Sequence, residues 1–142
     1  MDNQIPVAPQ YSKNFEQLGF GMFVHYGLFS QLERGEWVFK YTGKGMDDYQ
    51  KLAETFNCKT MADIVATAKS AGCKYICLTT RHHEGFSLWN SKVNPFNSYN
   101  YYGRDIVQEF VDACRKYDLR IGLYSSLMDW HHPDSWRCAN DP

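Results

Sequence analysis

The chain has 142 residues, of which 44% are hydrophobic and 22% charged, the length and composition of one soluble globular domain rather than a disordered chain. Its formal net charge is -1 and no run of basic residues marks a phosphate-binding face, which argues against nucleic acid as a partner. The odd count of five cysteines, with no CxxC pair, predicts reduced thiols rather than a disulfide framework or a zinc knuckle.

The N-terminal residues show neither a basic segment followed by an apolar one nor a stretch long enough to span a membrane. We therefore expect a cytoplasmic protein without a membrane partner. Residues 1–12 are expected to form an N-terminal arm, because Pro6 and Pro9 oppose regular structure. The whole span 1–142 is treated as one domain.

The first predicted strand covers residues 21–25, a short apolar run that ends in His25. Residues 28–45 follow, with three glycines and with Glu36 and Trp37 in the middle. This segment is too irregular for a single element and too rich in large side chains for a linker. It is predicted to be a packed loop that can carry function.

The rest of the chain alternates between predicted helices and strands. Thr60 with Asp63 is a candidate capping box for one helix, and Gly72 is a candidate stop signal for the same helix. The predicted elements are helices at 47–56, 60–71 and 104–117 and strands at 74–79 and 120–125.

Alternation of strand and helix predicts an α/β fold with a parallel sheet and right-handed crossovers. Two architectures compete, a doubly wound sheet and a (β/α)8 TIM barrel. No GxGxxG or GxxxxGK[ST] motif follows a predicted strand, which favours the barrel. Because a full barrel needs about 250 residues, the chain is expected to hold an N-terminal portion, truncated after about three β/α units.

Histidines follow two of the predicted strands. The segment TTRHHEGF at 79–86 places His82 and His83 directly after a buried strand, and His25 ends the preceding strand. The carboxyl ends of parallel strands meet at one edge, so these imidazoles are expected to share a pocket. Adjacent residues point in different directions, which argues against a metal site and favours a hydroxyl-rich ligand; no metal and no cofactor are expected.

Three further residues are candidates for the same pocket. Glu36 and Trp37 pair a strong acceptor with a large ring, a combination suited to the hydroxyls and the C–H face of a sugar. Tyr124 closes the third strand and is placed to point its hydroxyl into the pocket. Residues 129–132, Asp-Trp-His-His, follow that strand, and a structural role is favoured for them.

Five segments together resemble the catalytic domain of the retaining α-L-fucosidases, glycoside hydrolase family 29. The pair of histidines lies in the most specific of them, and all five occur in the family's order. They are FGMFVHYG at 20–27, GEWV at 35–38, AGCKYICLTTRHHEGFSLWNSK at 71–92, GRDIV at 103–107 and LRIGLYSSLMDWHHPDSW at 119–136.

The resemblance implies a hydrolase that removes terminal α-L-fucose from fucosylated oligosaccharides or glycoconjugates. It implies that six residues bind the fucose in its pocket: His25, Glu36, Trp37, His82, His83 and Tyr124. The family's attacking residue is an Asp at the end of the fourth strand, expected beyond Pro142, so no catalytic residue is assigned within the chain.

Two other functions stay open at this point. One is a non-catalytic fucose-binding fragment, and the other is a metal-dependent hydrolase of the barrel type. Three strands without the rest of a barrel leave a parallel edge unpaired, so self-association is also expected.

Overall fold

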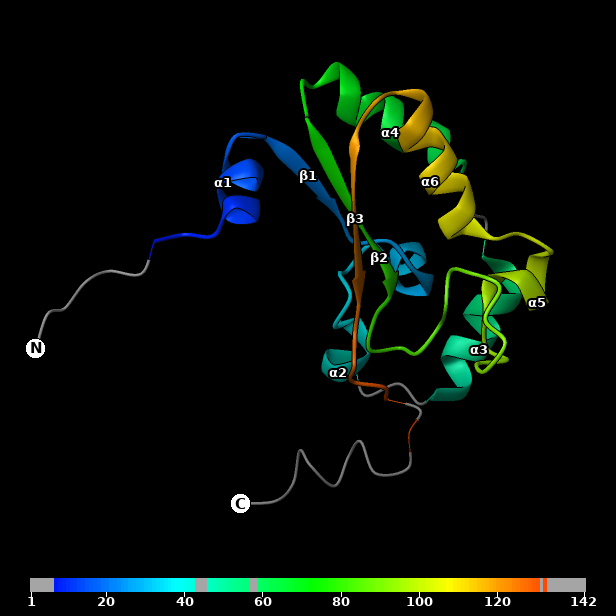
Figure 1. Cartoon of the computed structure of the whole chain (residues 1–142). Coiled ribbons are helices and arrows are strands. Elements are labelled where there is room, and N and C mark those ends of the chain that lie inside the picture. The colour runs from blue at the N-terminus through cyan, green and yellow to red at the C-terminus, as the bar shows by residue number, and fades with distance from the viewer. Residues whose placement is uncertain (1–6, 43–45, 57–58, 131, 133–142) are drawn as a thin grey trace, which may run out of the picture.

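The computed structural model describes residues 7–42, 46–56, 59–130 and 132. Helices separate the successive strands of this part of the chain (Figure 1). The elements are α1 Gln10–Glu16, β1 Gly21–Val24, the 3-10 helix η1 Leu28–Leu32, α2 Val38–Thr42, α3 Met46–Thr55, α4 Met61–Ser70, β2 Tyr75–Arg81, α5 Ser98–Tyr102, α6 Ile106–Lys116 and β3 Arg120–Ser125. Within the described ranges, none of the helices combines the length and apolar character needed to cross a bilayer.

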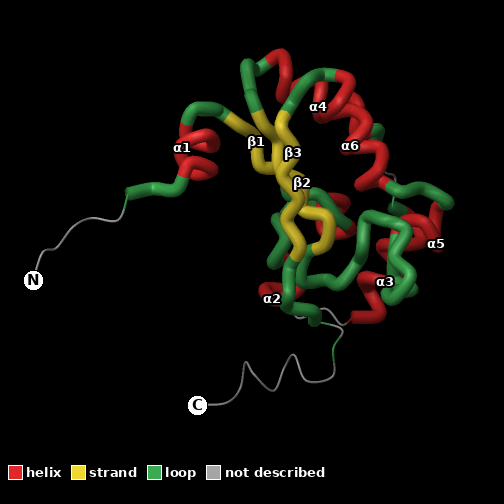
Figure 2. The backbone as a smooth tube through the Cα atoms, viewed as in Figure 1, coloured by secondary structure: helices red, strands yellow, loops and turns green. Residues whose placement is uncertain are grey.

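The three strands form one parallel sheet in the order β1-β2-β3, with β2 in the centre. Figure 2 shows the strands in yellow and the helices in red. Phe23 of β1 lies opposite Cys77 of β2, which in turn lies opposite Gly122 of β3. This arrangement confirms the expected α/β fold with a parallel sheet. It also brings the carboxyl ends of all three strands to one edge, below the sheet in Figure 1, where the loops that follow them gather.

Helices α4 and α6 lie side by side along one face of the sheet (Figure 1) and make the densest helix–helix contact of the described chain. Beneath them, Ile76 and Leu78 of β2 are fully buried, as are Val65 of α4 and Phe110 of α6. The continuous apolar run of β2 therefore supplies the centre of the core. At about 1.5 to 3 kcal/mol for each large apolar side chain removed from water, this layer holds the strands in register.

The rest of the described chain covers the sheet unevenly. On the helical face the side chains of Ile121 and Leu123, in the edge strand β3, stay 40% and 53% exposed. On the opposite face Phe23 of β1 is 53% exposed. The sheet is thus buried over β2 and open at both edges.

Several elements differ from the sequence prediction. The helix α1 begins at Gln10, inside the segment expected to be an arm, with Pro9 as its N-cap residue. Proline does not oppose a helix at its start, where its missing N–H would have no partner within the helix. The predicted packed loop contains η1 and α2. The capping box is also wrong, since the Thr60 hydroxyl donates to the Asp63 carboxylate at 2.6 Å instead of binding the helix backbone.

Asp105 joins α6 to the loop that precedes it. One carboxylate oxygen accepts from the Gln108 backbone N–H at 2.9 Å, and the other accepts from the Asn90 N–H at 3.0 Å. Asp105→Ala is expected to lower the free energy of unfolding by about 1 kcal/mol, the usual effect of losing an N-cap. Urea denaturation measures this, and Asp105→Asn should recover only part of the loss, because its amide has one accepting oxygen where Asp105 uses two; an alanine variant as stable as the wild type would contradict this role.

Candidate functional site

Three histidines meet at the carboxyl edge of the sheet. The rings of His25, directly after β1, and His82, directly after β2, have centroids 5.7 Å apart. The rings of His82 and His83 are 4.2 Å apart with their planes 52° from parallel. Residues separated by more than fifty positions are therefore neighbours because their strands are parallel and adjacent, as the sequence pattern predicts.

Aromatic side chains enclose two of these imidazoles. Tyr124 of β3 and Phe29 of η1 have ring centroids 5.8 Å from that of His82. On the other side of the pair, Trp37 and Trp130 lie 5.1 and 5.3 Å from His83 and 5.7 Å from each other. Two tryptophans from different loops thus form an apolar wall beside His83.

Glu36 brings a carboxylate to the same place. One carboxylate oxygen of Glu36, one ring nitrogen of His25 and one of His82 all lie within 4.8 Å of one another. The structure therefore brings together all six residues that the sequence singled out for this pocket, with Glu36 and Trp37 supplied by the segment between β1 and α3. Their binding of a sugar stays a prediction.

The hydrogen bonds of His83 determine what its free nitrogen can do. The Ser126 hydroxyl donates to the Met128 carbonyl at 3.0 Å, and His83 Nδ1 lies 2.6 Å from the same hydroxyl oxygen. A hydroxyl has one proton, so its oxygen must accept from the Nδ1–H of His83. In the neutral ring Nε2 then carries a lone pair and accepts hydrogen bonds from a ligand.

This geometry predicts the tautomer of His83. In ¹⁵N NMR of the imidazole groups, Nδ1 of His83 is expected to be protonated and Nε2 unprotonated near neutral pH. Ser126→Ala removes the acceptor and should reduce the population of this tautomer, whereas Ser125→Ala, at the exposed neighbouring position, should leave it unchanged. A wild-type spectrum with the proton on Nε2 would contradict the assignment.

Burial keeps both paired histidines neutral. It lowers the pKa of His82 to about 4, an effect that His83 reinforces and Glu36 partly opposes. Burial also lowers the pKa of His83, with Glu36 and the Met128 carbonyl acting in the opposite direction and Arg81 in the same one. Neutral rings can both donate and accept, which suits them to hydroxyl groups.

Arg81 fixes the loop after β3. Its guanidinium pairs with the Asp129 carboxylate and donates to the Ser126 carbonyl at 2.9 Å. The Trp130 backbone N–H donates to the His83 carbonyl at 2.8 Å. The loops after β2 and β3 are therefore held together, which places Ser126 and Trp130 against His83.

Behind the histidines, Glu84 is 1% exposed and anchors the loop after β1. One of its oxygens accepts from the Leu28 N–H at 3.2 Å. Gly27 allows this approach, since a Cβ there would lie 2.4 Å from that oxygen. The other oxygen has no partner in the described part of the chain, and burial raises the pKa of Glu84 to about 8.

Sequence reasoning missed one contributor to the site, Ser126. Ser126 lies just beyond the predicted strand at 120–125. Its place just after the end of a strand, two residues beyond Tyr124, is the feature of the sequence that could have identified it. The structural role predicted for Trp130 agrees with its burial, since it is 7% exposed. His131, in the same predicted segment as Trp130, lies outside the described residues.

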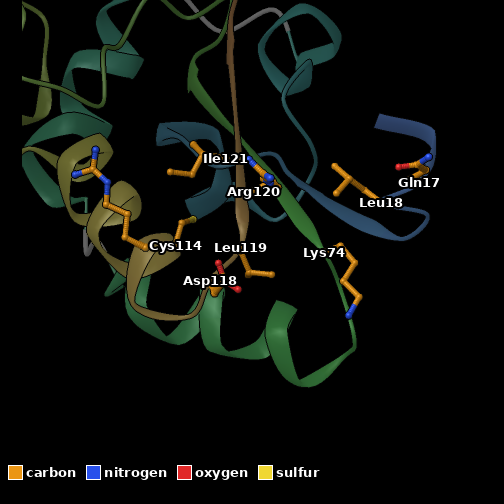
Figure 3. Close-up of a pocket in the computed structure, with 9 residues that line it drawn as sticks. Gln17, Leu18, Lys74, Cys114, Asp118, Leu119, Arg120 and Ile121 are labelled. Carbon is orange, nitrogen blue, oxygen red and sulfur yellow. The ribbon is translucent and has the colours of Figure 1, made fainter. Parts of the chain in front are cut away.

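A cavity of about 730 Å³ lies at the opposite end of the sheet (Figure 3). It is bordered by Lys74, just before β2, by Arg120 at the start of β3 and by Asp118 after α6. Sites in parallel α/β folds lie beyond the carboxyl ends of the strands, so the histidine cluster is the better candidate for the functional site.

Comparisons with known proteins agree on one family. The family model described as α-L-fucosidase matches residues 3–141. The human plasma α-L-fucosidase is 38% identical, covering 89% of this chain and 32% of its own length. Tissue α-L-fucosidase of Macaca fascicularis is 37% identical, covering 84% of this chain, so the chain spans about 30% of that relative.

Solved structures give the same result. α-L-Fucosidase isoenzyme 1 from Paenibacillus thiaminolyticus is 40% identical with a TM-score of 0.82, covering 88% of this chain and 30% of its own. The α-L-fucosidase AlfC from Lactobacillus casei, in complex with its α-L-fucose product, is 37% identical with a TM-score of 0.79. The match covers 89% of this chain and 44% of that one. This chain belongs to the α-L-fucosidase family.

Proposed function

We propose that the chain is the fucose-binding part of a retaining α-L-fucosidase that removes terminal α-L-fucose from fucosylated glycans. The observation that carries the proposal is the convergence of His25, His82, His83 and Glu36 at the carboxyl edge of a parallel sheet. Membership of the family supports it, as does the likeness to a solved relative that holds α-L-fucose.

In this proposal each side chain has a chemical task. The imidazoles of His25, His82 and His83 exchange hydrogen bonds with separate sugar hydroxyls, and His83 accepts through Nε2. Glu36 accepts from a further hydroxyl. The Trp37 ring, already packed against His83, covers the apolar C–H face and the region of the C5 methyl group.

The proposed fold of the whole enzyme is a (β/α)8 barrel, of which these residues supply about three units. A retaining mechanism needs two carboxyl groups about 5 to 5.5 Å apart, one as nucleophile and one as acid. Among the described carboxylates, Asp129 is held by Arg81 and Glu84 is buried, so Glu36 is the one beside the imidazoles. We assign Glu36 to hydroxyl binding and place the family's nucleophile outside these residues.

An assay with an aryl α-L-fucoside tests this division of labour. The 142-residue chain is expected to release no phenol above background. Turnover by the wild type that His83→Ala abolishes would show that the chain carries its own nucleophile and would overturn that part of the proposal.

A non-catalytic fucose-binding role is the second candidate, favoured by the same single carboxylate beside the imidazoles. Both candidates predict that this chain binds fucose and does not hydrolyse a fucoside. They differ in whether the gene also encodes a nucleophile. They separate when any coding sequence that follows Pro142 is read: a further strand ending in an Asp supports the enzyme. Sequence without such a strand supports the binding fragment.

Self-association belongs to the proposal as well. Both β1 and β3 are edges of the sheet, and Phe23, Ile121 and Leu123 are 53%, 40% and 53% exposed. Unpaired edges and uncovered apolar side chains promote pairing between chains. Size-exclusion chromatography is expected to show species larger than a monomer, and a sharp monomeric peak at all concentrations would contradict this.

A further inference from the structure

Three potential metal ligands from separate segments converge in the site. Nitrogens of His25 and His82 and an oxygen of Glu36 all lie within 4.8 Å of one another. Tetrahedral zinc, with bonds of 2.0 to 2.2 Å, holds such atoms about 3.4 Å apart. Closing that difference needs only side-chain rotation, and His25 is exposed and Glu36 half-buried, so both can turn.

A second observation concerns the imidazole of His82. His82 is 5% exposed, and its Nδ1 has no hydrogen-bond partner in the described part of the chain. A buried polar atom without a partner is costly, by about 1 to 3 kcal/mol. The ring is held by contacts with Phe29 and Tyr124, so it offers a positioned imidazole to a ligand rather than one that must be ordered first.

The composition of the group suits a particular class of ion. Two imidazoles and one carboxylate match the His₂Glu set that binds zinc in several hydrolases, with water or another ligand in the fourth position. His83 is not one of the three residues whose ligand atoms converge, and its ring packs on Trp37 and Trp130 instead. In the sequence, no Asp or Glu stands at a clear metal-ligand spacing from His25. The fold brings Glu36 to it from eleven residues further along the chain.

We propose that His25, Glu36 and His82 bind a divalent transition-metal ion of the zinc class, and that this ion excludes the sugar from the site. The metal site stands on the geometry alone, whereas the exclusion rests on the proposed function, since it requires fucose to bind the same three side chains. The ion is therefore an inhibitor of sugar binding and takes no part in hydrolysis.

Calorimetric titration of the 142-residue chain with ZnCl₂, under a phosphine reductant that keeps the cysteines as thiols, tests the metal site. One binding event is expected, weakened at least tenfold by His25→Gln and by Glu36→Gln. These positions are exposed and half-buried, so both variants should fold. His132→Gln, at an exposed histidine outside the group, is the matched control and should bind zinc like the wild type.

Zinc binding that neither substitution weakens would overturn the site, as would a thiolate-to-metal band in the near-ultraviolet spectrum of the Co²⁺ form. Adding L-fucose is expected to raise the apparent Kd for zinc. If zinc binds through His25 and Glu36 but L-fucose neither binds nor competes, the metal site stands, and the exclusion is overturned together with the proposed function. If L-fucose binds and zinc does not, only the metal proposal fails.

Discussion

Glu84→Gln is expected to stabilise the protein at alkaline pH. At pH 9 its free energy of unfolding should exceed that of the wild type by about 3 to 5 kcal/mol, since each pKa unit is worth about 1.4 kcal/mol. The difference should vanish below about pH 4, where the wild-type carboxyl is neutral in both the folded and the unfolded chain.

The sign follows from burial. The pKa of Glu84 is raised from an ordinary value of 4.5 to about 8, so between these values the folded protein keeps a proton that the unfolded chain has lost. The stability that this residue contributes is complete below pH 4.5 and is lost as the pH rises through 8. Glutamine retains the oxygen that accepts from the Leu28 N–H and has no charge to bury.

Urea unfolding of wild type and variant between pH 4 and pH 9, at one protein concentration, measures the effect. Glu54→Gln, at an exposed carboxylate of α3, is the matched control and should track the wild type. A stability difference between Glu84→Gln and wild type that does not change with pH would contradict a buried neutral acid at this position.

His83→Ala is expected to weaken L-fucose binding by about 10- to 100-fold, the effect of removing one partner of a hydrogen bond in a largely buried site. The loss has two parts. Nε2 no longer accepts from the sugar, and Trp37 and Trp130 lose the ring that both pack against.

Titration of the ¹⁵N-labelled protein with L-fucose, followed by NMR, gives the two affinities. His132→Ala, which removes an exposed histidine outside the cluster, should bind like the wild type. A His83→Ala variant that keeps a native spectrum and binds L-fucose as tightly as the wild type would show that His83 does not contact the sugar.

Periodicity and strand ends predicted most of the fold because they are local properties of the chain. The predicted strand at 120–125 matches β3, and the predicted helix at 47–56 differs from α3 by one residue at each end. Elements built from few residues were missed: α2 and α5 are five residues long, too short for an apolar period to stand out.

Some features of the candidate site could likewise be predicted from the sequence, and others could not. That His25, His82 and His83 meet follows from the alternation of strand and helix, without knowledge of any side-chain position. The position of Glu36 near His25 and His82 does not follow from it, because it depends on the path of an irregular segment. Nor could the burial of Glu84 be predicted, since a charged residue in a loop ordinarily faces water and here fits against Gly27.

We expect this chain to bind L-fucose at the carboxyl edge of its sheet. Titration with L-fucose, monitored residue by residue by NMR with D-fucose as the stereochemical control, tests it most directly. Saturable shift changes centred on His25, His82, His83 and Trp37 are expected with L-fucose and not with its mirror image. A folded protein whose spectrum does not respond to L-fucose, or responds equally to D-fucose, would contradict it.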